Sequence, residues 1–177
     1  MWGLACFQSA ESIARRPRTT DHCVVKPLET FPRASTAMSG TKIEQVTATA
    51  WERAKTGSKP DEAWLEALAA VYPPEMLLNQ IKHSCPKWAF SILCHEGWVA
   101  GVRRGSCPAA VGLRSAAITM RALERLQHHT SLASDKRELK RLVFGAPGSA
   151  AYRKPNDEVE VLLALRKLGA LITPDIK

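Results

Sequence analysis

The sequence contains none of the short motifs that mark common nucleotide-binding or hydrolytic enzymes. It has no G-x-x-x-x-G-K-[ST] phosphate loop, no G-x-G-x-x-G turn, no H-E-x-x-H helix and no G-x-S-x-G nucleophile turn. His95-Glu96 begins like the zinc motif, but Gly97 follows at once and the second histidine is missing. The acidic pairs Asp61-Glu62 and Asp157-Glu158 fall in expected first helical turns, where the helix dipole explains them. We therefore expect a protein that is not an enzyme and takes no cofactor.

Paired cysteines and long apolar runs are missing as well. The five cysteines are odd in number and form no C-x-x-C motif, which argues against a secreted disulfide framework and for a reducing cytoplasm. The spacings of Cys85, Cys94 and Cys107 do not match a zinc ribbon, so we expect buried, inert thiols and no metal. No run approaches the roughly 18 apolar residues that span a bilayer, so we expect no membrane helix.

The first 37 residues differ from the rest of the chain. They contain Pro17, Pro27 and Pro32, several Ser and Thr residues, and no sustained apolar period. We expect residues 1–37 to be a disordered arm or an upstream misassigned start, without a signal peptide. Residues 38–177 have ordinary globular composition and are expected to form one helical domain.

From Thr41 onward, apolar residues recur at a spacing near 3.6, which predicts successive helices with short connections. Thr41 and Glu44 have the spacing of a capping box, and Gly97 has the place of a left-handed helix stop. The pattern predicts an all-α fold. The expected helices span about 43–54, 58–71, 75–83, 86–97, 112–129, 135–144 and 156–169, with Ser58, Ser134 and Asn156 as further caps.

The third and fourth helices are separated by only two or three residues, a connection that suits a helix-turn-helix corner. In the fourth helix, Ala89, Phe90, Ile92 and Leu93 are expected to face inward. The residues expected on the outer face, in position to enter a DNA major groove, are Lys87, Trp88, Ser91 and His95. For two of these side chains an ordinary structural role is the main alternative: packing for Trp88 and helix-end hydrogen bonding for His95.

The segment after Gly97 alternates in polarity over residues 98–102, which predicts a short strand. Arg103 and Arg104 would then form the tip of a basic wing that reaches phosphate or the minor groove. Residues 106–110 have poor strand character for the return. The alternative is an extended link to the fifth helix, with a helix-turn-helix-like corner and no true wing.

The positive charge is concentrated in one block of the sequence. Residues 82–154 contain 13 lysines and arginines against 4 acidic residues, whereas the net charge of the whole chain is only +8. A concentrated cationic surface attracts polyphosphates. Scattered, solvated basic helices are the simpler alternative.

The order Cys85-Pro86-Lys87-x-x-Phe90 and then Leu93-Cys94-x-Glu96-Gly97-x-Val99-x-Gly101-Val102 resembles an uncharacterised bacterial family of small helical proteins. The resemblance extends over roughly residues 42–172. It implies a bacterial, cytoplasmic helical domain and carries no activity.

Two functional hypotheses follow from these patterns. The first is a DNA-binding, helix-turn-helix-like protein such as a transcriptional regulator. The second is a protein-interaction module, an adaptor or inhibitor associated with phage or host defence, whose basic face meets an acidic partner. The residues expected to contact nucleic acid are Lys87, Trp88, Ser91, His95, Arg103, Arg104, Arg114, Lys136, Arg137, Lys140 and Arg141.

Overall fold

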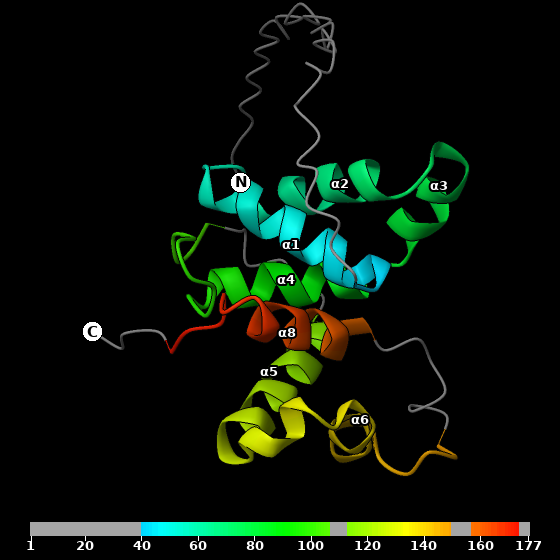
Figure 1. Cartoon of the computed structure of the whole chain (residues 1–177), viewed down its shortest axis with the longest axis vertical. Coiled ribbons are helices and arrows are strands. Elements are labelled where there is room, and N and C mark those ends of the chain that lie inside the picture. Colours follow the sequence, from blue (N-terminus) through cyan, green and yellow to red (C-terminus); the bar gives the residue numbers. More distant parts are fainter. Residues whose placement is uncertain (1–39, 107–112, 150–156, 174–177) are drawn as a thin grey trace, which may run out of the picture. The chain divides into compact units, whose positions relative to one another are not determined.

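A computed structural model describes residues 40–106, 113–149 and 157–173, all within the unit Ala37–Lys177. The expected arm or misassigned start at residues 1–37 and the expected cap at Asn156 lie outside these residues. The described part contains seven α-helices and one 3-10 helix, which confirms the all-α prediction (Figure 1). Their bounds are α1 Lys42–Lys55, α2 Pro60–Val71, α3 Pro74–Lys82, α4 Cys85–His95, α5 Leu113–His128, η1 Thr130–Ala133, α6 Lys136–Phe144 and α8 Asp157–Lys167.

Local chemistry explains where several helices begin. The capping box of α1 is confirmed, because the Glu44 amide donates to Thr41 Oγ1 at 3.3 Å and the Thr41 amide donates to Glu44 Oε2 at 3.0 Å. The predicted Ser58 cap is wrong: Lys59 holds the N-cap position of α2 and makes no side-chain cap. Ser134 is also displaced, by Asp135, whose carboxylate accepts the Glu138 amide of α6 at 2.9 Å.

The glycine stop after α4 is confirmed. Gly97 has φ +82, and its amide donates to the Cys94 carbonyl at 3.1 Å. The Trp98 amide donates to the Leu93 carbonyl at 2.8 Å, so two carbonyls of the last turn are satisfied. A side chain at position 97 would be strained in this left-handed conformation.

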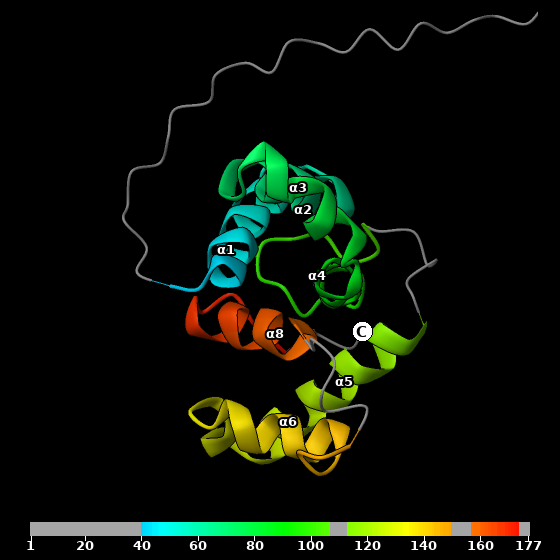
Figure 2. The same ribbon diagram turned by 90° about the vertical axis from the view of Figure 1, so that its right-hand side faces the viewer.

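Helix α4 lies in the middle of the described unit. It contacts α2 on one side and α5 and α8 on the other. Figures 1 and 2 show α1, α2 and α3 on one side of the α4 and α8 layer, and α5 and α6 on the opposite side. An aromatic contact in the core joins α2 to α4, where the Trp64 and Phe90 ring centroids are 5.6 Å apart. The central position of α4 determines which of its residues can reach a ligand.

Of the strand predicted over residues 98–102, only Val99 is paired. It forms an isolated antiparallel bridge with Leu171, in the segment after α8, and residues 107–110 of the predicted return lie outside the described residues. The Ala100 amide donates to the Ala170 carbonyl at 2.8 Å, and the Ile172 amide donates to the Trp98 carbonyl at 2.9 Å. The Ala100 amide and the Trp98 carbonyl, which a wing could use to bind its return strand, are therefore bonded to the segment after α8.

Candidate nucleic-acid interface

The predicted groove-facing stripe on α4 is wrong at its centre. The inward positions of Ala89, Phe90 and Leu93 are confirmed, since all three are fully buried. Ser91 is also 0% exposed, and in the described structure its hydroxyl has no hydrogen-bond partner. Helix α4 is covered on two sides by neighbouring helices, so Ser91 cannot contact a base.

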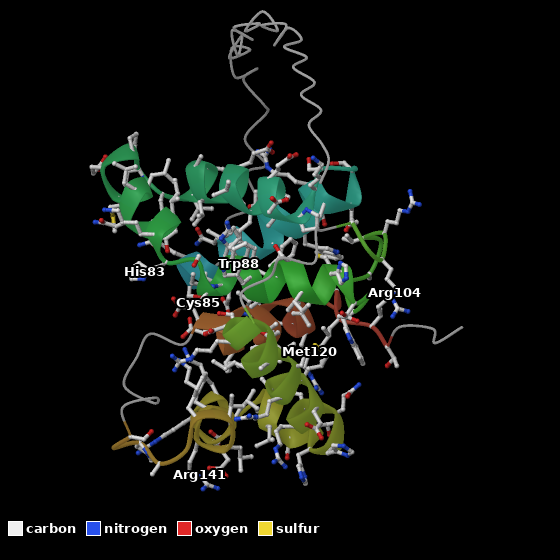
Figure 3. All side chains as sticks on the ribbon, turned by 180° about the vertical axis from the view of Figure 1, so that it is seen from behind. His83, Cys85, Trp88, Arg104, Met120 and Arg141 are labelled. Carbon is white, nitrogen blue, oxygen red and sulfur yellow. The ribbon has the colours of Figure 1, made fainter. Side chains whose placement is uncertain are left out.

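Lys87 and Trp88 lie at the N-terminal end of α4 and interact with each other. The Lys87 ammonium is 4.4 Å from the centroid of the Trp88 ring, a cation–π distance, and both residues are half-buried. Figure 3 shows Trp88 close to His83 and Cys85 at this end of the helix. Cys85 is exposed, which corrects the expectation that this thiol is buried, whereas Cys94 is buried as expected.

The opposite end of α4 is closed by the turn that carries Arg103 and Arg104. The carbonyl of His95, the last residue of the helix, accepts the Gly105 amide at 2.9 Å. Both arginines are exposed, and Arg104 runs over Gly97, where a built Cβ would lie 3.4 Å from Arg104 Cγ. Figure 3 shows Trp88 and Arg104 at opposite ends of α4, so the expected stripe and wing tip are not one surface.

Most of the basic residues expected on α6 are engaged with carboxylates. Lys136 and Lys140 both contact Glu160 Oε1, at 2.6 Å and 3.4 Å. Burial alone would raise the pKa of Glu160, but the two lysines outweigh it and hold that pKa below the ordinary value. Arg141 contacts the Glu138 carboxylate through two nitrogens, at 2.6 Å and 2.5 Å, and this hydrogen-bonded pairing lowers the pKa of Glu138. These three cations are therefore largely neutralised.

A row of arginines on α5 stands out from these paired cations. Arg114, Arg121 and Arg125 are exposed, and at 3.6 residues per turn they fall within about 40° of one another around the helix axis. Arg121 donates to the Val143 carbonyl in the last turn of α6 at 3.4 Å, which places the row beside that helix. Arg114 was expected at the interface; Arg121 and Arg125 were missed, although the intervals of seven residues from Arg114 to Arg121 and four from Arg121 to Arg125 are visible in the sequence.

In the part of the chain that the structure describes, the arginine row forms no ion pair, although Glu124 is exposed on the same helix three residues after Arg121. Within the described residues, no ion pair involves the three arginines of the row or the other exposed arginines at positions 103, 104 and 137. By contrast, α1 and α2 pair their bases internally, as Arg53 with Glu66, Lys55 with Glu52, and Lys59 with Glu62. The exposed arginines without an ion pair in the described chain thus lie on α5, on the 103–104 turn and at Arg137.

The start of α8 carries a second group of charged residues. Burial raises the pKa of Asp157, and repulsion from Glu160 adds to it, while Lys140, His83 and Lys136 oppose the shift. Burial and the same two carboxylates raise the pKa of Tyr72. Glu158, 2% exposed, accepts a hydrogen bond from Ser115 Oγ of α5 at 3.2 Å through one carboxylate oxygen. The contact ties the first turn of α8 to α5.

Within the described residues, no group of three or more His, Cys, Asp or Glu side chains is arranged to hold a metal ion. A pocket of about 100 Å³ is lined by Trp98, Leu123, Gln127, Leu171, Ile172 and Thr173. Its volume is below the roughly 300 Å³ at which small-molecule sites begin. Among the described helices, none has the length and apolarity needed to cross a membrane.

The fold defines a single-domain, all-α protein that carries an unpaired arginine row on one helix. The chain belongs to a family of unknown function, DUF6979, whose sequence model matches residues 41–172. This range agrees with the span of roughly 42–172 over which the resemblance was expected. Comparison with curated proteins and with solved structures found no match.

Proposed function

We propose that the protein binds nucleic acid, in the first place duplex DNA, through the arginine row of α5 and not through α4. The observation that carries this proposal is the alignment of Arg114, Arg121 and Arg125 on the exposed side of one helix, without acidic partners in the described structure. We do not propose that α4 enters a DNA groove as a helix-turn-helix would, because α4 is packed between other helices.

The geometry favours contacts with the phosphate backbone. The row spans about 16 Å along the axis of α5, at about 1.5 Å per residue, and so faces several successive phosphates of a duplex. Guanidinium groups match phosphate oxygens bidentately and keep their charge at all physiological pH values. No base-reading element accompanies the row in the described residues, so the binding we propose has little sequence preference.

The test is the salt dependence of binding to a labelled 20-base-pair duplex, followed by fluorescence anisotropy between about 50 and 200 mM salt. The double variant Arg114→Gln/Arg125→Gln should reduce the slope of log K against log salt by about 2. The matched control is Lys55→Gln/Lys59→Gln, which removes the same charge from residues already paired with Glu52 and Glu62. Salt-insensitive binding, or equal loss in both variants, would contradict the proposal.

An acidic protein partner is the second candidate, because carboxylates can occupy the same guanidinium groups. It is favoured by the position of the row on an open helix face with no groove-inserting element in the described residues. A partner that co-purifies at about 0.5 M salt, where phosphate contacts are largely lost, and that is released by Arg114→Gln/Arg125→Gln, would favour this candidate over DNA.

The proposal places the protein in a bacterial cytoplasm. The bacterial origin rests on the resemblance through Cys85-Pro86-Lys87 and Leu93-Cys94-x-Glu96-Gly97. The exposed thiol of Cys85 is compatible with a reducing compartment. Trapping of thiols with an alkylating reagent in intact cells should label the exposed Cys85; an oxidised Cys85 in freshly lysed cells would argue against this compartment.

A further inference from the structure

Helix α3 is the most exposed helix of the described unit. None of its residues is buried, and its contacts with other elements are mainly with α2. Figures 1 and 2 show it at the edge of the unit beside α2, on the side away from α5 and α6. A short helix with so little covering gains little from its own packing, because tertiary contacts normally supply most helical stability.

One strip of the exposed surface of α3 is apolar. Leu78 is 70% exposed and Ile81 is 43% exposed, and Pro74 is exposed on the same side at the spacing i, i+4, i+7. We call Pro74, Leu78 and Ile81 the α3 stripe. Leu77, which is packed against the core, borders the stripe about 60° from Pro74 around the helix axis. The stripe has the pattern of a helix face that packs against another helix.

Two opposite charges flank the α3 stripe on one edge. Glu75 and Lys82 are exposed and seven residues apart, so they occupy the same position around the helix. Neither forms an ion pair within the described chain. Most other acidic side chains of α1 and α2 have a basic partner, as the Arg53–Glu66 and Lys59–Glu62 pairs illustrate. The two flanking charges are thus available to a partner.

We infer that the α3 stripe is a self-association surface, on which a second copy of this chain packs its own α3 in the antiparallel direction. A two-fold axis near Leu78 brings the two Leu78 side chains together and sets Pro74 of each copy against Ile81 of the other. The same axis places Glu75 of each copy beside Lys82 of the other, so two ion pairs form across the interface. A parallel two-fold pair would instead place the Glu75 and Lys82 flanks of the two copies on opposite sides of the interface, where they could not pair.

A second copy in the antiparallel direction therefore fits both the α3 stripe and its flanking charges. The contact is short, about two helical turns, which places it among small interfaces and predicts a dimer with a dissociation constant on the order of 10 µM. The surface is distinct from the α5 arginines, so the dimer and nucleic-acid binding can fail independently.

The experiment is sedimentation equilibrium of the full chain over about 1 to 200 µM, a range that brackets the expected dissociation constant. The wild type should show a monomer–dimer equilibrium, and Leu78→Asp should weaken it at least tenfold. The matched control is Met76→Asp, since Met76 is 41% exposed on α3 but lies about 160° from Leu78 around the axis. This control should dimerise like the wild type, and circular dichroism should show equal helix content in all variants.

Charge exchange tests the antiparallel direction. Glu75→Lys and Lys82→Glu should each weaken the dimer several-fold, because each sets like charges against one another. The double exchange should restore it, because both cross-pairs return with reversed sign. A wild type that stays monomeric at 200 µM, a double exchange no better than the single ones, or a Met76→Asp variant as weak as Leu78→Asp would each overturn the inference.

Discussion

The hydroxyl of Ser91 is enclosed by the core without a hydrogen-bond partner in the described structure. Burial of an unsatisfied hydroxyl costs about 1–3 kcal/mol. We therefore predict that Ser91→Ala leaves the free energy of unfolding unchanged or raises it by up to about 1 kcal/mol. Chemical denaturation measures this change. Ser91→Asp should instead destabilise strongly, because it buries an unpaired charge. A Ser91→Ala variant that keeps its stability but loses DNA affinity would contradict the buried position.

Among the described residues, Glu160 is the one carboxylate that contacts two lysines, Lys136 and Lys140. Its pKa is lowered in the folded state from the ordinary 4.5, so its stabilisation is complete above that pH and is lost as the pH falls through the folded value. We predict that Glu160→Gln lowers the unfolding free energy at pH 7 by about 1 kcal/mol. Below the folded pKa of Glu160 the difference from the wild type should vanish.

Denaturation series at several pH values measure the Glu160 effect. The control is Glu52→Gln, which breaks a more exposed pair with Lys55 and should change stability little at any pH. The pKa of Asp157 is shifted in the opposite direction to that of Glu160, because burial raises it. The variant Glu160→Gln also removes the repulsion between Asp157 and Glu160. If the unfolding free energy of Glu160→Gln stayed below that of the wild type by the same amount down to pH 2, the ion pairs with Lys136 and Lys140 would not contribute to stability.

The helices themselves were predictable because their signals are local. The Thr41–Glu44 box, the Gly97 stop and the apolar periods depend on neighbours within one or two turns, and the observed bounds agree with them. The faces of α4 were not predictable in this way. Its period shows that Phe90 and Leu93 face a core, but not that other helices also cover Ser91. Small residues such as Ser91 and Cys94 allow that second covering without changing the apolar pattern.

The partner of residues 98–100 was equally hidden, because the pairing joins segments about 70 positions apart. The Ile172 amide donates to the Trp98 carbonyl. Ile172→Pro removes this donor, and we predict a loss of about 1–2 kcal/mol of unfolding free energy. Ile172→Ala is the control, since the side chain is 44% exposed and the amide is kept. If thermal melts showed the same loss of stability for Ile172→Pro and Ile172→Ala, the Ile172 side chain, and not its backbone hydrogen bond, would account for the stabilisation.

The charge block of residues 82–154 illustrates what composition alone omits. Its excess is real, but the fold places Glu160 between Lys136 and Lys140 and sets Glu138 on Arg141. Trp88, Arg104 and Arg141 lie in separate parts of the described unit, so the expected single platform is not formed (Figure 3). The α5 row remains because its spacing is local, whereas neutralisation of Lys136 and Lys140 depends on Glu160 of α8, which follows later in the chain.

The central position of α4 predicts that the described helices unfold together. Four tryptophans lie between Trp51 and Trp98, so fluorescence reports mainly on α1–α4, while far-ultraviolet circular dichroism also reports on α5, α6 and α8. We predict coincident transitions in denaturant by the two signals, measured at one protein concentration. Phe90→Ala removes the ring that packs on Trp64 and should shift both transitions together, by about 3–5 kcal/mol. If dichroism kept a second transition after fluorescence had changed, α5 and α6 would be an independent unit, and the core joined by α4 would not be cooperative.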